Sequence, residues 1–135
     1  MTKKFCLDNT FVSDYLAGKQ YTKRFLQNHS SNSEFYVPSL VRYEAYVPAF
    51  QTGGTRNLKK SQNALKSFKD QSFEDREAII AAEIRAHLID GGQKIGAPDV
   101  LIAGVAKCLG ATVVTDNKKH FERVPGLNVI KPPRK

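Results

Sequence analysis

The chain has 135 residues, of which 41% are hydrophobic and 25% charged, and its 21 Lys and Arg against 13 Asp and Glu give a formal net charge of +8. This length supports one domain that can fold without disulfides or a structural metal, and this composition excludes a disordered or collagen-like chain. The positive charge favours a polyanionic partner such as nucleic acid, although solubility alone gives many small proteins a similar balance.

Strands and helices alternate along the first half of the chain. The predicted elements there are a buried strand over residues 3–8, helices over 10–16 and 21–28, a second strand over 34–38 and a helix that Ser39 opens. Pro48 is predicted to kink or end this last helix, because proline lacks the amide hydrogen and its ring clashes with the preceding turn. Residues 51–56 are expected to be the loosest stretch, and residues 57–70 a solvated helix or hairpin arm.

The same alternation continues in the second half. Ser72 is predicted to cap a helix that runs to about Ile89, and acidic residues in its first turn favour the positive end of the helix dipole. A buried helix follows Pro98, and short β-branched strands are predicted over residues 111–115 and 127–130. Alternating strands and helices imply parallel strands with right-handed crossovers, and hence an α/β sheet with helices on both faces.

The sequence contains no stretch with the features of a membrane span or a signal peptide. Its longest mainly apolar stretch, residues 100–106, is too short to cross a bilayer, and the first residues lack an apolar core followed by a cleavage site. Cys6 and Cys108 lie in apolar runs without Cys or His at ligand spacing, so we expect buried thiols rather than zinc ligands. A cytoplasmic protein without a membrane partner is therefore expected.

Four carboxylates stand at the ends of the predicted elements. Asp8 ends the first strand and Glu44 lies on the helix after the second strand, while Asp99 begins the buried helix. Asp116 follows the strand over residues 111–115. Because parallel sheets place their ligand sites at the carboxyl ends of strands, these side chains are expected to share one pocket. Converging carboxylates repel one another unless a cation joins them, and hard cations such as Mg²⁺ or Mn²⁺ prefer oxygen ligands.

Each acid also has an ordinary structural explanation. Asp8 could form an Asx turn, Asp99 could be a favourable charge in a first helical turn, and Asp116 could belong to a turn and helix cap. Glu44 could face solvent if a kink at Pro48 rotates its helix. Taken together with the basic excess, the four acids indicate metal-dependent phosphodiester chemistry.

Four segments of the sequence resemble the motifs of PIN-domain ribonucleases, and they are most similar to the VapC toxins of bacterial and archaeal toxin–antitoxin pairs. The segments are residues 5–16, 37–44, 95–106 and 111–127, which stand in the family's order with fitting gaps. Asp8, Glu44 and Asp99 occupy the family's first three acidic positions. The variable fourth position falls on Asp116 or Asn117, and the charged residue is preferred.

The resemblance implies a single PIN domain over residues 1–135, with a three-layer fold and a parallel sheet of four or five strands covered by helices on both faces. It implies an endoribonuclease that uses Mg²⁺ or Mn²⁺, with Asp8, Glu44, Asp99 and Asp116 as catalytic and metal-binding acids. The implied partners are RNA, with tRNA or another structured RNA expected, a VapB-like antitoxin, and a second copy of the chain. Candidate aromatics for a dimer interface are Tyr43, Tyr46 and Phe50.

Residues around the acids are candidates for supporting roles. Side chains that could orient the acids are Asn9, Thr10, Ser39, Thr115 and Asn117, and side chains that could contact RNA phosphates are Arg42, Arg85 and Lys118. Turn, cap and solubility roles are the alternatives for these residues.

Two other functions compete with the nuclease. A non-catalytic module on the same fold could bind RNA or a protein, because a fold alone does not give an activity. An aspartyl-phosphate phosphatase would match the opening at Asp8, but that chemistry needs a second aspartate where Thr10 stands.

Overall fold

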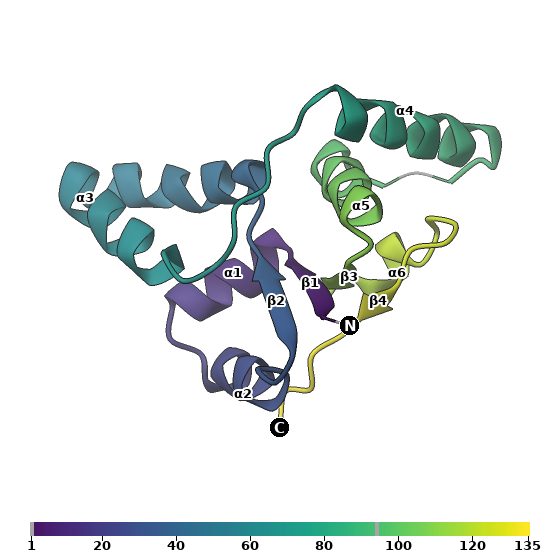
Figure 1. Cartoon of the computed structure of the whole chain (residues 1–135). Helices are drawn as coiled ribbons and strands as arrows, with labels where there is room; N and C mark the ends of the chain where they lie inside the picture. Colours follow the sequence, from purple (N-terminus) through teal and green to yellow (C-terminus); the bar gives the residue numbers. More distant parts are fainter. Residues whose placement is uncertain (1, 94) are drawn as a thin grey trace.

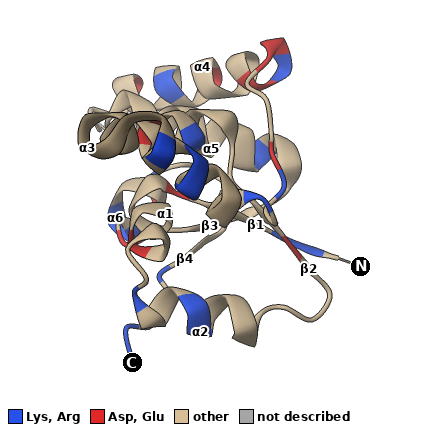
Figure 2. Cartoon of the chain, turned by 90° about the vertical axis from the view of Figure 1, so that its left-hand side faces the viewer, with Lys and Arg blue, Asp and Glu red and all other residues tan. Residues whose placement is uncertain are grey.

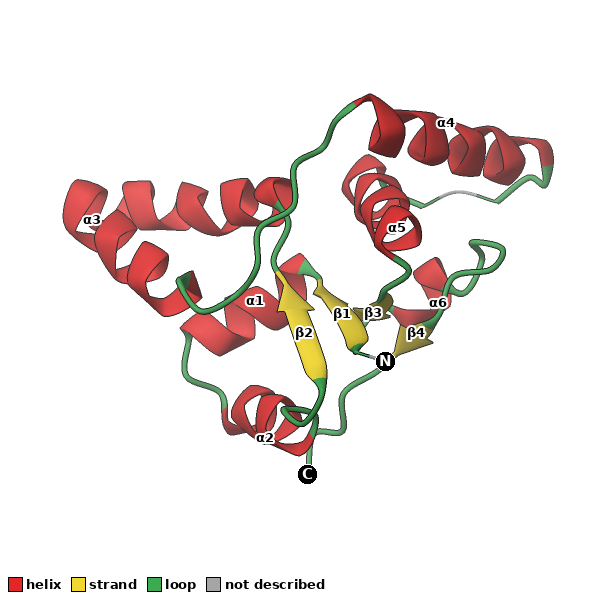
Figure 3. Ribbon diagram, viewed as in Figure 1, coloured by secondary structure: helices red, strands yellow, loops and turns green. Residues whose placement is uncertain are grey.

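The computed structural model describes residues 2–93 and 95–135, and its centre is a parallel sheet (Figure 3). The strands are β1 (Lys3–Leu7), β2 (Ser33–Tyr36), β3 (Thr112–Val114) and β4 (Val129–Ile130), and their order across the sheet is β2-β1-β3-β4. All three pairings are parallel, so the carboxyl ends of the strands lie along one edge of the sheet. The predicted α/β class is confirmed, with four strands in the described residues.

β1 occupies an inner position because its residues are apolar on both faces. Phe5, Cys6 and Leu7 are fully buried, and β1 pairs with β2 on one side and with β3 on the other. A strand covered on both faces is expected to be a continuous apolar run, as this one is. Beyond β2, a single bridge joins Tyr36 to Lys69. The polar residues around Lys69 do not extend this bridge into a fifth strand.

Helices flank the sheet. Those in the described residues are α1 (Asn9–Leu16), α2 (Gln20–Asn28), α3 (Ser39–Leu65), α4 (Asp75–Asp90), α5 (Ala97–Leu109) and α6 (Lys118–Phe121). Figure 1 shows α4 and α5 on one side of the sheet and α2 on the other. Phe25 of α2 packs edge-on against Phe5 of β1, and six residues of α5 are buried, which confirms the predicted buried helix. In the part of the chain that the structure describes, no helix is long and apolar enough to cross a membrane.

Helix α3 changes direction at Gly54 and not at Pro48, so the predicted break at Pro48 is wrong. Pro48 lies inside the helix, whereas Gly54 has φ of 57° and ψ of −136°, the non-helical backbone angles inside α3. This combination is open essentially only to glycine. The missing amide of a proline weakens a helix, but a residue with positive φ redirects the chain outright. Figure 1 shows the two resulting arms of α3.

Helix α4 begins at Asp75, and its cap is Glu74 rather than the predicted Ser72. The Glu74 side chain accepts from the backbone of Glu77, and the Glu77 side chain accepts from the backbone N–H of Glu74 at 3.0 Å. This reciprocal pair satisfies two amide groups at the start of the helix. The sequence offered Ser72 as the favoured residue type, but the glutamate pair has the correct spacing for both bonds.

Candidate active site

The four acids predicted from the sequence lie at the carboxyl edge of the sheet and interact electrostatically. Asp8 follows β1, Asp116 lies just beyond β3, and Asp99 stands in the first turn of α5. The charges of Asp99 and Asp116 raise the pKa of Asp8, and the charge of Asp99 raises the pKa of Glu44 on α3. Segments that are far apart in the sequence therefore contribute negative charge to one region.

Asp8 is fully buried and both of its carboxylate oxygens accept hydrogen bonds. The backbone N–H of Phe11 donates to Oδ1 at 2.9 Å, so Asp8 is the N-cap of α1, and the Thr115 hydroxyl donates to Oδ2 at 2.5 Å. Burial raises the pKa of Asp8 to about 6, although both hydrogen bonds act in the opposite direction. Asp8 is therefore a helix cap rather than the Asx turn considered from the sequence, and this role does not remove it from the acidic region.

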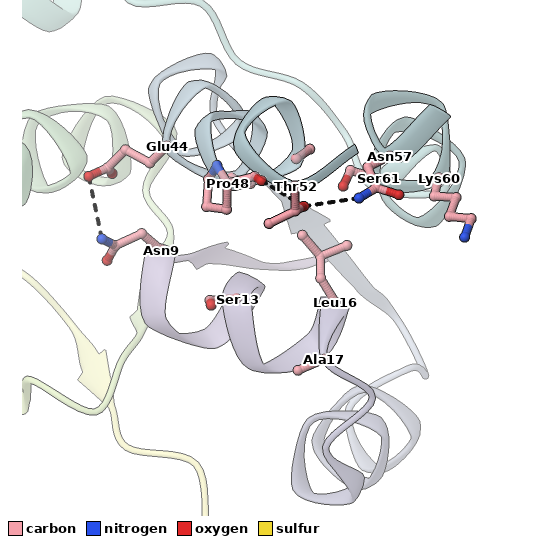
Figure 4. A pocket seen from close by; sticks show the side chains of 12 residues that line it. Asn9, Ser13, Leu16, Ala17, Glu44, Pro48, Thr52, Asn57, Lys60 and Ser61 are labelled. Carbon is pink, nitrogen blue, oxygen red and sulfur yellow. Dashed lines mark hydrogen bonds between the residues drawn. The ribbon is translucent and has the colours of Figure 1, made fainter. Parts of the chain in front are cut away.

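Glu44 has one oxygen held by the protein and one without a partner. The side-chain amide of Asn9 donates to Oε2 at 3.4 Å, whereas Oε1 is buried and has no hydrogen-bond partner (Figure 4). Burial is the main cause of the raised pKa of Glu44, and the charge of Asp99 adds to it. The alternative in which Glu44 faces solvent is therefore not what the structure shows.

Asp116 shows the same division between its two oxygens. The guanidinium of Arg134 donates to Oδ2, while Oδ1 is buried and has no partner. Asp99 differs, because its Oδ2 lies 3.3 Å from Nδ1 of His120 on α6. Glu44 and Asp116 thus each have one carboxylate oxygen that is removed from water without compensation, which is costly unless a cation or another donor reaches it.

The residues present fit a divalent cation in their chemistry. Among the described residues, no group of three or more His, Cys, Asp or Glu side chains is close enough to hold a metal ion as the side chains stand. The unpartnered atoms, Glu44 Oε1 and Asp116 Oδ1, are both carboxylate oxygens, the ligand type that Mg²⁺ and Mn²⁺ prefer. Carboxylates that raise one another's pKa repel each other, and the same cation would reduce this repulsion.

The predicted supporting residues divide into two groups. Thr115 contacts Asp8 and Asn9 contacts Glu44, while Asn117 is the N-cap of α6 and donates its backbone N–H to the Thr115 hydroxyl at 2.9 Å. The hydroxyl of Ser39 donates instead to Asp70 at 3.0 Å. For Thr10, the described contacts include no hydrogen bond from its hydroxyl to an acid.

The predicted RNA-contacting residues lie in different settings. Arg42 donates to the backbone carbonyls of Val37 and Phe68, so its guanidinium ties α3 to neighbouring segments. Arg85 donates to the Ile95 carbonyl at 3.0 Å. Lys118 is exposed at the start of α6 and lines a depression together with Asp116.

The sequence did not reveal two residues that contact the acids. His120 follows two lysines and has the pattern of a solvated basic turn, yet it reaches Asp99. Arg134 lies beyond the last strand, in a segment without periodicity, and its contact with Asp116 depends on the path of the chain after β4. The signal for His120 is weak and consists of its position one residue before the buried Phe121.

A groove of about 520 Å³ extends from the acids along α3. Asn9 and Glu44 line one end, and Thr52, Asn57 and Lys60 line the rest of it together with small apolar residues (Figure 4). Asn57 donates to the Thr52 hydroxyl at 3.0 Å across the bend in α3. The groove is therefore continuous with the candidate site and mixes polar and small apolar surface.

Comparison with known proteins gives a family match over most of the chain. The sequence model of the PIN domain family matches residues 5–127. The tRNA(fMet)-specific endonuclease VapC of Salmonella typhimurium is 35% identical over 74 residues, which are 55% of this chain and 56% of that protein. Ribonuclease VapC2 of Rickettsia felis is 32% identical over 104 residues, 73% of this chain and 74% of that protein. The chain thus spans just over half of the first relative and about three quarters of the second.

Solved structures show the same fold. VapBC2 from Rickettsia felis bound to a DNA fragment from its promoter contains a chain with a TM-score of 0.86 and 24% identity, covering 94% of this chain and 97% of that one. DNA-bound VapBC from Salmonella typhimurium contains a chain with a TM-score of 0.83 and 28% identity, covering 96% and 98%. The resemblance extends over nearly the whole length of each chain.

Proposed function

Because the chain belongs to the PIN domain family, we propose that it is an endoribonuclease that uses Mg²⁺ or Mn²⁺ to hydrolyse RNA phosphodiester bonds. The observation that carries this proposal is the gathering of four carboxylates at one edge of the sheet, two of which keep a buried oxygen without a partner. A divalent cation supplies the partner that both oxygens lack.

The residues of the site have separate tasks in this proposal. Glu44 Oε1 and Asp116 Oδ1 are the atoms free to hold the cation, and Asp8 and Asp99 add negative charge beside them. The bound cation would lower the pKa of a coordinated water and neutralise charge on the reacting phosphate. Thr115 holds Asp8 by a hydrogen bond, so the carboxylate cannot rotate away from the site.

We extend the proposal to tRNA or another structured RNA as the substrate. Support comes from the relative that is named a tRNA(fMet)-specific endonuclease and from the formal charge of +8. Figure 2 shows lysine and arginine positions along α3, which carries Arg56, Lys59 and Lys60, and Lys60 lines the groove. Such cations bind the phosphate backbone by releasing counterions.

We also propose that residues 1–135 form one PIN domain that acts in the cytoplasm as the toxin of a toxin–antitoxin pair. The partner would be a VapB-like antitoxin, because the similar solved structures are VapBC complexes. A second copy of the chain is the other proposed partner. Its contact face would contain Tyr43, Tyr46 and Phe50, of which Tyr43 is 69% exposed and Phe50 57% exposed.

A cleavage assay with matched acidic variants tests the nuclease. Wild-type protein should cleave tRNA transcripts in Mn²⁺, and EDTA should abolish the cleavage. Asp99→Asn should lower the rate by more than about 100-fold, because it removes a charge from the metal pocket itself. Losing a residue that only supports a metal ligand costs up to about 100-fold, so the loss of an acid of the pocket should cost more. Asp90→Asn, which neutralises an exposed acid at the end of α4, should cleave like the wild type. Equal rates for the wild type and Asp99→Asn would contradict the proposal.

One observation favours a second candidate, a non-catalytic RNA-binding or protein-binding module. No three potential ligands in the described residues are close enough to hold a metal without movement. Mn²⁺ titration separates the two candidates, because an ion that binds the folded protein raises its melting temperature. A module without a metal site should show no such increase, whereas the nuclease should show one that Asp99→Asn reduces.

A further inference from the structure

The chain after β4 returns to the helices that surround the acidic pocket. Pro132 is buried, and the guanidinium of Arg24 on α2 donates to the backbone carbonyl of Arg134 at 2.8 Å. The backbone of Arg134 is therefore attached to α2, which is remote from it in the sequence.

The side chain of Arg134 is held on three sides. Its guanidinium lies 3.9 Å from the centre of the Tyr21 ring, and it donates to Oδ2 of Asp14 at 3.3 Å. The Tyr21 hydroxyl donates to the same oxygen of Asp14, so the aromatic ring and the carboxylate are themselves joined. The remaining contact of the guanidinium is with Oδ2 of Asp116. This is a built arrangement of charged and aromatic groups, and no step proposed above uses it.

The contact with Arg134 determines which oxygen of Asp116 is available. Oδ2 is taken by the guanidinium, and Oδ1 stays buried without a hydrogen-bond partner. Glu44 has the same division, with Asn9 on Oε2 and a free Oε1. In each case one donor from the protein fixes the carboxylate and leaves its second oxygen for another ligand.

We propose that Arg134 is a positioning residue that orients Asp116 so that its free oxygen can bind the metal. This inference rests on the proposed metal-dependent function. An outer donor that fixes a ligating carboxylate raises metal affinity because the ligand no longer loses rotational freedom on binding. Arg134 thereby makes the segment after β4 part of the metal site.

The alternative is that Arg134 occludes the site as a competing cation. Its position argues against this, because Asp14 already provides a carboxylate for the guanidinium and the side chain is 46% exposed. Solvent and the neighbouring negative charge weaken the repulsion between the arginine and a divalent cation. The orientation of Asp116 is then the larger effect.

Mn²⁺ binding to the full chain, measured by calorimetry without RNA, tests the inference. Arg134→Met keeps the length of the side chain and removes its donors, and we expect it to weaken Mn²⁺ binding by about 10-fold or more. Arg134→Lys keeps the charge but lacks the planar fork of donors that reaches Asp14 and Asp116 from one stacked group, so it should restore the affinity only in part. Lys135→Met removes the same charge from an exposed neighbour and should bind Mn²⁺ like the wild type.

Three results would overturn the inference. Arg134→Met could bind Mn²⁺ as tightly as the wild type, it could bind more tightly, as an occluding arginine predicts, or Lys135→Met could weaken binding equally. Melting temperatures in EDTA show whether a variant is folded, and Arg134→Lys provides the comparison if Arg134→Met is not. If the wild type binds Mn²⁺ but cleaves no RNA, the proposed function fails, and the Mn²⁺ affinities still decide the role of Arg134.

Discussion

Asp8 stabilises the fold through one property and destabilises it through another. As the N-cap of α1 it satisfies the Phe11 amide, which is worth about 1 kcal/mol. As a fully buried carboxylate with a pKa of about 6, it favours the protonated form in the folded protein. The helix cap needs only an oxygen atom, whereas the proposed metal site needs the negative charge.

Asp8→Asn should therefore stabilise the metal-free protein in a pH-dependent way. The folded-state pKa lies about two units above the ordinary value of 3.8, so the wild type loses about 2–3 kcal/mol as pH rises from about 4 through 6. Asparagine also caps helices and carries no charge to bury. Urea denaturation in EDTA should show Asp8→Asn more stable than the wild type by about this amount at pH 7.5, with the difference vanishing near pH 4.

The control for this prediction is Glu122→Gln, which neutralises an exposed carboxylate after α6. It should change stability little at either pH. A stabilisation by Asp8→Asn that is the same at pH 4 and pH 7.5 would show that the charge of Asp8 is not its cause.

The residues of the candidate site were predictable where local patterns placed them. Asp8 follows an apolar strand, and Glu44 stands in apolar surroundings on a helix, so both positions carried a signal. Arg134 reaches Asp14 across 120 positions in the sequence, and its own segment has no periodic pattern. A contact of that range depends on the whole path of the chain, which local propensity does not encode.

At the scale of elements, α3 shows how two local rules can differ in their outcome. The sequence predicts a kink or end at Pro48 and a loose stretch over residues 51–56, whereas the structure continues the helix through Pro48 and breaks it at Gly54, inside that stretch. Proline disfavours helix without forbidding it, and packing of neighbours such as the buried Ala49 can offset the loss. The inner strand β1 and α5 were easier to predict, because continuous apolar runs leave few alternatives.

Gly54→Ala should destabilise the protein by about 1–3 kcal/mol, because its backbone angles are strained for any side chain with a Cβ. Chemical denaturation measures the change. Gly53→Ala is the neighbouring control, since its Cβ would meet the flexible end of the Asn57 side chain and alanine favours helix. Gly53→Ala should therefore destabilise the protein clearly less than Gly54→Ala does. Equal losses of stability at the two positions would show that the backbone angles of Gly54 are not the cause of the destabilisation.

At the scale of the whole molecule, the outer face of α3 carries an apolar row. Tyr43, Val47 and Phe50 are spaced for one helix face and are 69%, 42% and 57% exposed. Residues on the inner face, such as Val41, are buried. A row of large apolar side chains on the outside of a small protein is typical of an association surface, which supports the proposed contact between two copies.

Sedimentation analysis tests this dimer. The wild type should be dimeric, and Phe50→Ser should raise the dissociation constant by about 30-fold or more, as expected when an aromatic anchor worth about 2 kcal/mol is lost. Ile79→Ser removes an equally exposed apolar side chain from α4 and should leave the dimer intact. A monomeric wild type, or equal effects of the two substitutions, would rule out α3 as the interface.

The pairing of β1 with β3 has a consequence for the protein during its synthesis. Asp8 is made early, but the Thr115 hydroxyl that holds it is 107 positions further along the chain, and Arg134 comes later still. A nascent chain that has emerged only through α5 has no neighbour for β1 on that side and no Asp116. For the proposed ribonuclease, the ribosome, itself made largely of RNA, would therefore be exposed to an inactive chain until β3 and β4 had emerged and joined the sheet.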